Sequence, residues 1–245
     1  MQMYDKNKLS ERAKELHVVR DTFEKVCRLC AVLKFFDSSD LLRDALALKG
    51  GTAINVLFFN LPRLSVDIDL DYSHNISRDD MMTERMQIGD TIRKYMKAEG
   101  YSESERSKFP HSLDSFVFDY VNAGGMKDNI KIEINYSLRS HVFPISRIKM
   151  SSEIIDGGFE VNTVDPKEIY ASKTVALLTR AAARDLYDIN YMIRYGLFDD
   201  SEIEEYRKCV VFYLAVATVS SPPKKASNYL YTKLRISDII KQTEE

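Results

Sequence analysis

Hydrophobic and polar residues alternate over a short segment near residue 70, and this alternation predicts a β-strand. Val66, Ile68 and Leu70 would share one face of the strand, because successive side chains point to opposite sides. The other face would carry the polar residues Ser65, Asp67, Asp69 and Asp71. Like charges on one face repel each other, so the pattern indicates that a positively charged group lies against these aspartates.

A second pattern of alternation predicts a β-hairpin. Residues 115–121 and 129–136 are both typical of strands, and residues 122–125 begin the turn between them. In the second strand, one face would carry Ile130, Ile132, Ile134 and Tyr136, and the other Lys131, Glu133 and Asn135. Glu133 is therefore a further carboxylate on the side opposite an apolar face.

Apolar positions at three- and four-residue spacing predict helices in much of the remaining chain. In the first part these helices are 8–36, 52–59 and 78–99, with Ser77 as the cap of the last one and Gly100 at its end. In the second part they are 166–182, 184–195, 201–219 and 227–242. The chain is thus predicted to be α+β, with a mixed core in residues 1–160 and a helical domain in residues 161–245.

Composition narrows the class of protein only a little. The 245 residues are 44% hydrophobic and 29% charged, with a net charge of -2, which is ordinary for a globular protein. No apolar run reaches the ~18 residues that a membrane span needs, and the N-terminal residues lack the apolar segment of a secretion signal. We therefore expect a cytoplasmic protein without a membrane partner. Cys27 and Cys30 form a C-x-x-C within a predicted helix, and without a second ligand pair they are expected to be reduced thiols.

The paired aspartates suggest a metal site. Residues two apart on a strand lie about 6.6 Å apart along its axis and point the same way. Asp67 and Asp69 could therefore bind one or two divalent cations, and Mg²⁺, or alternatively Mn²⁺, prefers such oxygen ligands. Glu133 from a neighbouring strand would complete a site of the two-metal kind. A bound cation would also offset the repulsion between the aspartates.

The segment Gly50-Gly51-Thr52 suggests a phosphate-binding loop. Glycines let the backbone approach a phosphate closely, and the N–H groups at the start of a following helix favour an anion. Thr52 could add a hydroxyl donor. A loop of this kind before a metal-binding strand is a suitable arrangement for a nucleoside triphosphate.

The order of these motifs resembles the nucleotidyltransferase-like toxins of abortive-infection and type IV toxin–antitoxin systems, the AbiEii and MenT-like family. The first family motif, G-G-[ST] followed by R-x-S-x-D-I-D, is matched in order by Gly50, Gly51, Thr52, Arg63, Ser65, Asp67, Ile68 and Asp69. The second, a basic residue before h-E-h, is similar to Lys131, Ile132, Glu133 and Ile134. The third, K, R and then R-D-h-x-D, is similar to Lys173, Arg180, Arg184, Asp185 and Asp188.

The resemblance implies a DNA polymerase β-like nucleotidyltransferase core with a helical C-terminal lobe. It also implies metal-dependent transfer of a nucleotide from a triphosphate to an acceptor, with RNA, particularly the tRNA 3′ end, as a substrate class. The protein would act as a toxin, with a cognate antitoxin protein as a possible partner. The residues after Asp188 match no family motif.

The resemblance also implies roles for individual residues. Asp67 and Asp69 would bind metal, and Glu133 would be either a third ligand or the base that deprotonates the attacking hydroxyl. Lys173 would hold the triphosphate, while Asp185 and Asp188 would orient Lys173 and Arg184 or serve the chemistry directly. The residues expected to bind the nucleotide are Gly50, Gly51, Thr52, Arg63, Ser65, Lys173, Arg180 and Arg184.

Three other functions are compatible with parts of the pattern. The same core could nucleotidylate a small molecule or a protein side chain, because a fold does not determine the acceptor. A glycosyltransferase could use a D-x-D metal site for a nucleotide-sugar, but the early glycine pair and the cluster between Lys173 and Asp188 argue against it. A catalytically idle nucleotide-binding module is the third possibility, although every expected carboxylate is present.

An RNA acceptor would require cations along its path. The candidates are Arg139, Arg147 and Lys149, and near the C-terminus Lys224, Lys225, Lys233 and Arg235. We expect neutralisation of the C-terminal set to weaken RNA binding and its salt dependence without affecting triphosphate binding.

Overall fold

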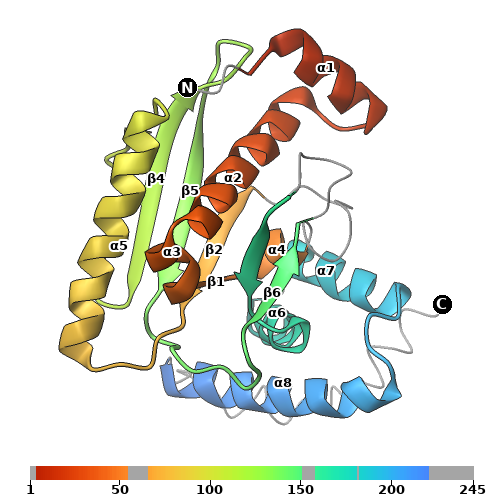
Figure 1. Cartoon of the computed structure of the whole chain (residues 1–245). Helices are drawn as coiled ribbons and strands as arrows, with labels where there is room; N and C mark the ends of the chain where they lie inside the picture. Colours follow the sequence, from red (N-terminus) through yellow and green to blue (C-terminus); the bar gives the residue numbers. More distant parts are fainter. Residues whose placement is uncertain (1–3, 55–65, 151–157, 181, 221–245) are drawn as a thin grey trace. The chain divides into compact units, whose positions relative to one another are not determined.

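The computed structural model of the chain describes residues 4–54, 66–150, 158–180 and 182–220. It divides the chain into two compact units, residues 1–165 and residues 166–245 (Figure 1). The first unit combines helices with a β-sheet, and the described part of the second is helical. The predicted α+β class is therefore confirmed. The predicted boundary between functional domains at residue 160 stays a prediction.

The first unit contains five helices and seven strands among its described residues. The helices are α1 (Lys6–Glu15), α2 (Arg20–Ser38), α3 (Asp40–Ala45), α4 (Gly50–Ala53) and α5 (Arg78–Ala98). The strands are β1 (Leu46–Lys49), β2 (Asp67–Tyr72), β3 (Ser102–Glu103), β4 (Leu113–Val121), β5 (Lys127–Asn135), β6 (Ser146–Lys149) and β7 (Glu160–Thr163).

The strands form one mixed sheet in the order β3-β4-β5-β2-β1-β7-β6. β2 lies near its middle, antiparallel to β1 and parallel to β5. The predicted hairpin is confirmed as the antiparallel pair β4–β5. Gly125 lies in the turn with a φ of 83°, a left-handed conformation that glycine adopts without steric cost. This order brings β1, β2 and β5 side by side, although the chain reaches them at residues 46, 67 and 127.

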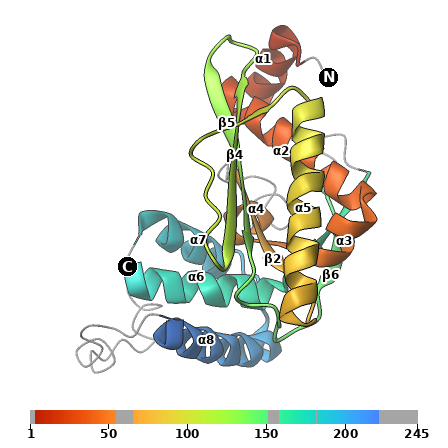
Figure 2. The same ribbon diagram turned by 90° about the vertical axis from the view of Figure 1, so that its left-hand side faces the viewer.

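The long helices α2 and α5 cover the same face of this sheet (Figure 2). The ring of Tyr95 on α5 stacks on Phe35 of α2 with centroids 3.8 Å apart, and its hydroxyl donates to the carbonyl oxygen of Ala31. Beneath the helices, Ile68 and Leu70 of β2 are almost completely buried. The apolar face predicted from alternation is therefore the core face, which leaves the aspartates of β2 on the opposite side of the sheet.

Some helix boundaries differ from the prediction. The single helix expected over residues 8–36 is two helices, because His17 adopts a left-handed conformation with a φ of 55°. The N–H of Val18 then returns to the carbonyl oxygen of Ala13 and ends α1. The helix expected over residues 52–59 begins earlier, at Gly50, and its residues after 54 lie outside the described part of the chain.

The predicted cap of α5 is confirmed, and four strands were missed. α5 begins after Ser77, whose hydroxyl accepts a hydrogen bond from the N–H of Asp80 at 3.1 Å. β1, β3, β6 and β7 are strands of two to four residues, too short for alternation to show.

The second unit consists, in its described residues, of α6 (Pro166–Arg180), α7 (Ala183–Arg194) and α8 (Asp200–Ser220). α6 packs against both other helices and contributes the buried Tyr170. Thr174 of α6 and Tyr206 of α8 share a hydrogen bond of 2.6 Å. All three helices were predicted to within about two residues, and the fourth, at residues 227–242, lies outside the described residues.

Candidate active site

β2 carries the two aspartates of the predicted metal site. In register with Asp69 lie Lys49 of β1 on one side and Glu133 of β5 on the other. Asp67 and Asp69 are partly exposed, whereas Ile68 between them is fully buried. The sheet therefore places the glycine segment that follows β1, the aspartates of β2 and the glutamate of β5 next to one another.

Gly50 lies directly against the side chain of Asp69. Its φ is 73°, and a Cβ atom added to it would lie 2.3 Å from Asp69 Oδ2. Such a separation is far below van der Waals contact, so only glycine leaves room for the carboxylate at this place. The requirement for glycine here comes from both the backbone conformation and the position of the Asp69 side chain.

Thr52 connects the glycine segment to β2. Its side chain is fully buried, and its hydroxyl donates a hydrogen bond to the main-chain carbonyl oxygen of Asp67. A hydroxyl has one proton to donate, so the expected donation to a phosphate would require this bond to break. In the structure, Thr52 holds the segment against the strand.

Asp71 continues the row of aspartates but has a different environment. It is 2% exposed, forms an ion pair with Lys49 and accepts a hydrogen bond of 2.9 Å from Asn135 Nδ2. Sequence reasoning placed Asp71 on the charged face and missed both partners. The signals were Lys49 directly before the glycines and Asn135 two residues after Glu133, but only the strand register brings them to Asp71.

Glu133 is held by two neighbouring side chains. Its Oε1 atom lies 2.9 Å from Lys131 Nζ and accepts a hydrogen bond of 3.0 Å from the Ser115 hydroxyl. Ser115 of β4 lies directly opposite Glu133, which explains the contact. Lys131 was part of the predicted motif, but Ser115 was missed.

The chemistry of Asp67 and Asp69 fits a divalent cation with oxygen ligands. Both carboxylates lie on the same side of one strand, and among the described residues none forms an ion pair with Asp67. Across the residues that the structure describes, no group of three or more His, Cys, Asp or Glu side chains is arranged to hold a metal ion. The observed set is thus a pair of aspartates, and Glu133 as a third ligand stays a prediction.

The second unit brings together four other predicted residues. Lys173 Nζ lies 3.1 Å from Asp188 Oδ2 and 3.8 Å from Asp185 Oδ1. Arg180 donates two hydrogen bonds to Asp185, from Nε at 2.7 Å and from Nη2 at 2.8 Å. Both aspartates are buried, at 0% and 2% exposed. The hydrogen bonds from Arg180 to Asp185 raise the pKa of that guanidinium.

The negative charges of the two aspartates in this cluster are balanced by the positive charges of Lys173 and Arg180. An ion pair with two hydrogen bonds fixes the orientation of both groups, and a buried carboxylate needs such partners. An ammonium group has three donors, so the contact with Asp188 leaves Lys173 with capacity for a further acceptor. This arrangement can orient a lysine and retain its positive charge.

Three predicted nucleotide-binding residues cannot be placed. Arg63 and Ser65 lie outside the described residues, and the side chain of Arg184 is also outside them. Their roles stay predictions. The four C-terminal cations expected to contact RNA, between residues 224 and 235, are outside the described part of the chain as well.

Two of the other cations expected to contact RNA, Arg139 and Arg147, have partners within the protein, whereas Lys149 is exposed and forms no ion pair with a described residue. Arg139 donates a hydrogen bond of 2.9 Å to the carbonyl oxygen of Ile76. Arg147 binds Glu160 at 2.9 Å and Asp37 at 2.6 Å, and these hydrogen bonds raise the pKa of its guanidinium. Both arginines therefore have structural roles in this unit, which reduces their capacity to bind an external phosphate.

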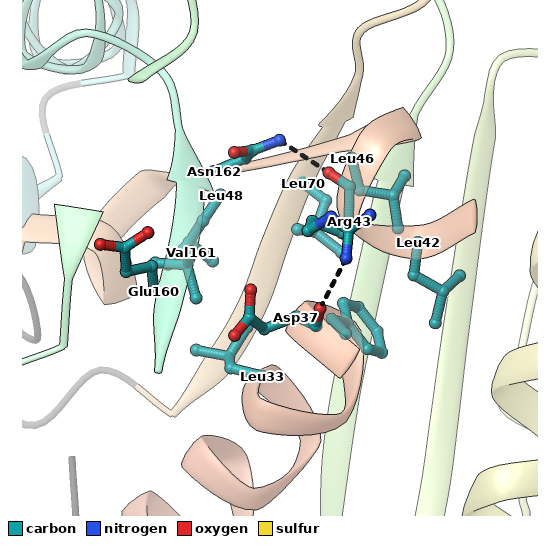
Figure 3. Close-up of a pocket in the computed structure, with 11 residues that line it drawn as sticks. Leu33, Asp37, Leu42, Arg43, Leu46, Leu48, Leu70, Glu160, Val161 and Asn162 are labelled. Carbon is teal, nitrogen blue, oxygen red and sulfur yellow. Dashed lines mark hydrogen bonds between the residues drawn. The ribbon is translucent and has the colours of Figure 1, made fainter. Parts of the chain in front are cut away.

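A cavity of about 20 Å³ lies on the other side of the sheet, beneath α2 and α3 (Figure 3). Leu33, Leu48 and Leu70 contribute to its walls, and Asn162 closes it by donating to the carbonyl oxygen of Arg43 at 2.7 Å. This volume is comparable to that of a single water molecule. It is a packing gap of the core and not a substrate site.

The C-x-x-C segment has the properties of ordinary core thiols. Cys27 and Cys30 are both free, and Cys30 is 1% exposed. Burial, together with the neighbouring Glu24, raises the pKa of the Cys27 thiol to about 11, and burial also raises that of Cys30. A protonated thiol is a poor nucleophile and metal ligand.

In the described part of the chain, no helix has the length and apolar character to cross a membrane.

Known proteins are similar to this chain in sequence and in fold. Residues 35–240 match the family described as nucleotidyl transferase AbiEii toxin, type IV toxin–antitoxin system. The fold is similar to MenT4, a nucleotidyltransferase toxin from Mycobacterium tuberculosis H37Rv, with a TM-score of 0.63 and 16% identity over 89% of this chain and 72% of that one.

Two Helicobacter pylori structures are also similar. JHP933 has a TM-score of 0.48 and 17% identity, and the match covers 92% of this chain and 87% of that one. A protein named as a putative nucleotidyltransferase has a TM-score of 0.48 and 18% identity, and the match covers 86% of this chain and 85% of that one. No curated protein matches the sequence.

Proposed function

Because this chain belongs to the AbiEii family of nucleotidyltransferase toxins of type IV toxin–antitoxin systems, we propose that it moves a nucleotide from a nucleoside triphosphate to an RNA acceptor. The proposed acceptor group is a 3′-hydroxyl, with the tRNA 3′ end as the substrate class. Its oxygen attacks the α-phosphorus, the bond from that phosphorus to the bridging oxygen breaks, and pyrophosphate leaves. The reaction depends on a divalent cation.

Asp67 and Asp69 are the proposed metal ligands. Both lie on one face of the strand, next to Gly50, where a side chain would not fit. This placement supports the role. A bound Mg²⁺ or Mn²⁺ would offset the charge of the aspartates and of the triphosphate. Held by these two carboxylates, the cation would supply positive charge to the triphosphate during attack on its α-phosphate.

Glu133 is the proposed acceptor of the hydroxyl proton. It lies in register with Asp69, and its carboxylate is oriented by the hydroxyl of Ser115 and the ammonium of Lys131. A general base must be within hydrogen-bond reach of the proton that it removes, so a fixed orientation is an advantage. A third metal ligand remains the alternative role for Glu133.

Lys173 is the proposed ligand of the triphosphate in the second unit. Asp188 and Asp185 orient it, and Arg180 anchors Asp185 through two hydrogen bonds. In this scheme the aspartates are positioning residues that fix the ammonium group. The likeness of the sequence order to the family motif supports the assignment, as does the burial of both carboxylates.

A single observation carries this proposal most directly: the fit of Gly50 against the carboxylate of Asp69. A solvated strand face requires no such fit, whereas a site that brings a phosphate and a metal ligand together does. The proposal is tested by incubating the protein with total RNA, Mg²⁺ and each of the four labelled triphosphates in turn. We expect label in RNA from the wild type and none from the Asp69→Asn variant.

The acceptor and the activity are tested separately in that experiment. Label transferred to protein or to a small molecule, with none in RNA, would replace the RNA acceptor by one of these. Absence of transfer from every triphosphate would identify an idle nucleotide-binding module. Expression of wild type and Asp67→Asn in a bacterium extends the test, because equal slowing of growth by both would contradict an enzymatic origin of toxicity.

A further inference from the structure

Lys49 links the start of the glycine segment to β2. It is the last residue of β1 and lies directly opposite Asp69, so both side chains point to the same side of the sheet. From there its ammonium group reaches diagonally along β2 and forms an ion pair with Asp71. Because Gly50 follows Lys49 directly in the chain, this ion pair fixes the point at which the glycine segment begins.

The end of the same segment has a second link to β2. The hydroxyl of Thr52 donates a hydrogen bond to the carbonyl oxygen of Asp67. Between the two links, Gly50 lies against the carboxylate of Asp69. Residues 49–52 therefore contact β2 at three alternate positions of the strand, and we name these four residues the clamped segment.

The partner of Lys49 is itself fixed by a chain of hydrogen bonds. Asp71 Oδ1 accepts a hydrogen bond of 2.9 Å from Asn135 Nδ2, and Asn135 Oδ1 accepts one of 2.6 Å from the hydroxyl of Ser137. The side chain of Asp71 is 3% exposed and that of Lys49 is 29% exposed. The orientation of the carboxylate is therefore set from β5, and Lys49 binds to a fixed partner.

An ion pair costs more free energy to bury than apolar side chains do. Each ion loses several kcal/mol of hydration, and an apolar pair of similar volume is often equally stable or more stable. What an ion pair adds is a defined geometry, because hydrogen bonds between charged groups are short and directional. The ion pair of Lys49 therefore adds to the constraint on Gly50, whose φ is 73°.

We propose that Lys49 is a positioning residue for the triphosphate: its ion pair with Asp71 holds the clamped segment in the conformation that receives a phosphate. The inference rests on the proposed function in that the glycine segment is taken to bind the triphosphate. A backbone that is fixed before the ligand arrives loses less conformational entropy on binding. Loss of the ion pair should therefore weaken triphosphate binding more than it slows the chemical step.

The direct test removes the ion pair without leaving a buried charge. The double variant Lys49→Met, Asp71→Leu replaces both charged groups by apolar side chains. Calorimetric titration of the full chain with non-hydrolysable analogues of the four nucleoside triphosphates, in the presence of Mg²⁺, gives the dissociation constants. For the analogue that binds the wild type most tightly, we expect this constant to rise by about tenfold, with the free energy of unfolding close to that of the wild type.

A matched control and a conservative variant accompany this test. Lys25→Met, Asp128→Leu removes another lysine–aspartate pair of the same unit, with Lys25 Nζ 3.2 Å from Asp128 Oδ1, and should leave the dissociation constant unchanged. Asp71→Asn keeps an oxygen that accepts from Lys49, so this variant should retain the wild-type affinity for the triphosphate.

Kinetics distinguish positioning from a purely structural role. Removal of the ion pair should raise the KM for the triphosphate by a factor similar to that of the dissociation constant, with kcat unchanged, because Lys49 acts on binding. A purely structural ion pair would instead change the free energy of unfolding and leave KM as in the wild type.

Equal triphosphate affinity of the wild type and the apolar double variant would overturn the proposal, and so would equal weakening by the control pair. If the double variant does not fold, Asn135→Ala decides, because it loosens Asp71 and leaves the ion pair in place. The affinity of Asn135→Ala should be about threefold lower than that of the wild type, and an unchanged affinity would contradict the role of Lys49.

Nucleotide transfer reports separately on the proposed function. Triphosphate binding that depends on the ion pair, without transfer by the wild type, would overturn the proposed function alone. Transfer by the wild type, with a triphosphate affinity that does not depend on the ion pair, would overturn the role of Lys49 alone. Absence of triphosphate binding by the wild type would overturn both.

Discussion

Aspartates form a cluster in each unit of the molecule, and the two clusters differ in the ion pairs that their carboxylates form. On β2, Asp67 is partly exposed and has no ion-pair partner among the described residues. On α7, Asp185 and Asp188 are buried and contact Arg180 and Lys173. A carboxylate that the protein itself neutralises fixes a geometry, whereas one without an ion-pair partner among the described residues, such as Asp67, favours a cation from outside.

The same difference occurs within a single strand. Asp71 lies on the same face of β2 as Asp67, four residues further on, and is buried with Lys49 and Asn135 as partners. Along the strand, Asp67 at one end has no ion-pair partner among the described residues, whereas Asp71 forms an ion pair with Lys49. Position along the strand, and not the residue type, determines the partners of each aspartate.

The largest expected effect concerns the pair on β2. Asp67→Asn or Asp69→Asn should reduce transfer by about a thousandfold, or about 4 kcal/mol of barrier, because a ligand for the metal is lost. The thermal midpoint should stay the same or rise slightly, since one of two repelling charges is removed. Initial rates with labelled triphosphate and a melting curve on the same samples check both parts. Activity near the wild-type level would contradict the role of these residues.

In the buried cluster, substitution of an aspartate is expected to lower the stability of the protein. Asp185→Asn should lower the free energy of unfolding by about 2–3 kcal/mol, because it leaves Arg180 and Lys173 without their shared carboxylate. The half-exposed guanidinium of Arg180 can turn to water, which limits the loss. Urea unfolding followed by circular dichroism gives the value. A change in stability no larger than that of Asp67→Asn would abolish the distinction between the two clusters.

Gly50 should affect both stability and activity. Gly50→Ala is expected to cost roughly 1–2 kcal/mol of stability, because alanine is strained at a φ of 73° and its Cβ would meet Asp69. The double variant Gly50→Ala, Asp69→Ala removes the contacts with the carboxylate group, but it keeps the contact of 3.0 Å with the Cβ atom of residue 69 and the backbone strain. A double-mutant cycle of unfolding free energies should therefore show recovery of part of the loss. Additive losses would show that the carboxylate is not what excludes a side chain at Gly50.

The smallest effect is expected at Ser115. Ser115→Ala removes one hydrogen bond to Glu133 and leaves the contact with Lys131, so transfer should fall by about tenfold or less. The loss should appear in kcat, with the KM for the triphosphate unchanged, because the residue orients a base and does not bind substrate. Restoration of activity by Ser115→Thr would support this positioning role. A change in KM alone would place Ser115 in nucleotide binding instead.

The sequence predicts the central parts of the fold because their signals are local. Alternation in β2 and β5 and the Ser77 cap are each determined by a few neighbouring residues, and the structure contains all three. The break at His17 and the short strands β6 and β7 have weak local signals, because a left-handed residue and a four-residue strand are stabilised by tertiary packing.

The site was predictable to a similar degree. The paired aspartates and the glycine segment are visible in the sequence because each lies within a few residues. The partners of Asp71 and Glu133 are not, since Asn135 is 64 residues from Asp71, and Ser115 is 18 from Glu133. Such contacts depend on strand order and register, which the chain determines only when it folds.

The central claim is that Asp67 and Asp69 hold a divalent cation, and Mn²⁺ binding tests it most directly. Electron paramagnetic resonance measures the free Mn²⁺ that remains when the full chain is titrated into the metal, without and with a non-hydrolysable triphosphate. The account predicts that the wild type depletes the free signal, more strongly with the triphosphate, and that Asp69→Asn does not. Asp71→Asn, whose carboxylate is already paired, should behave as the wild type. Equal depletion by the wild type and Asp69→Asn would contradict the account.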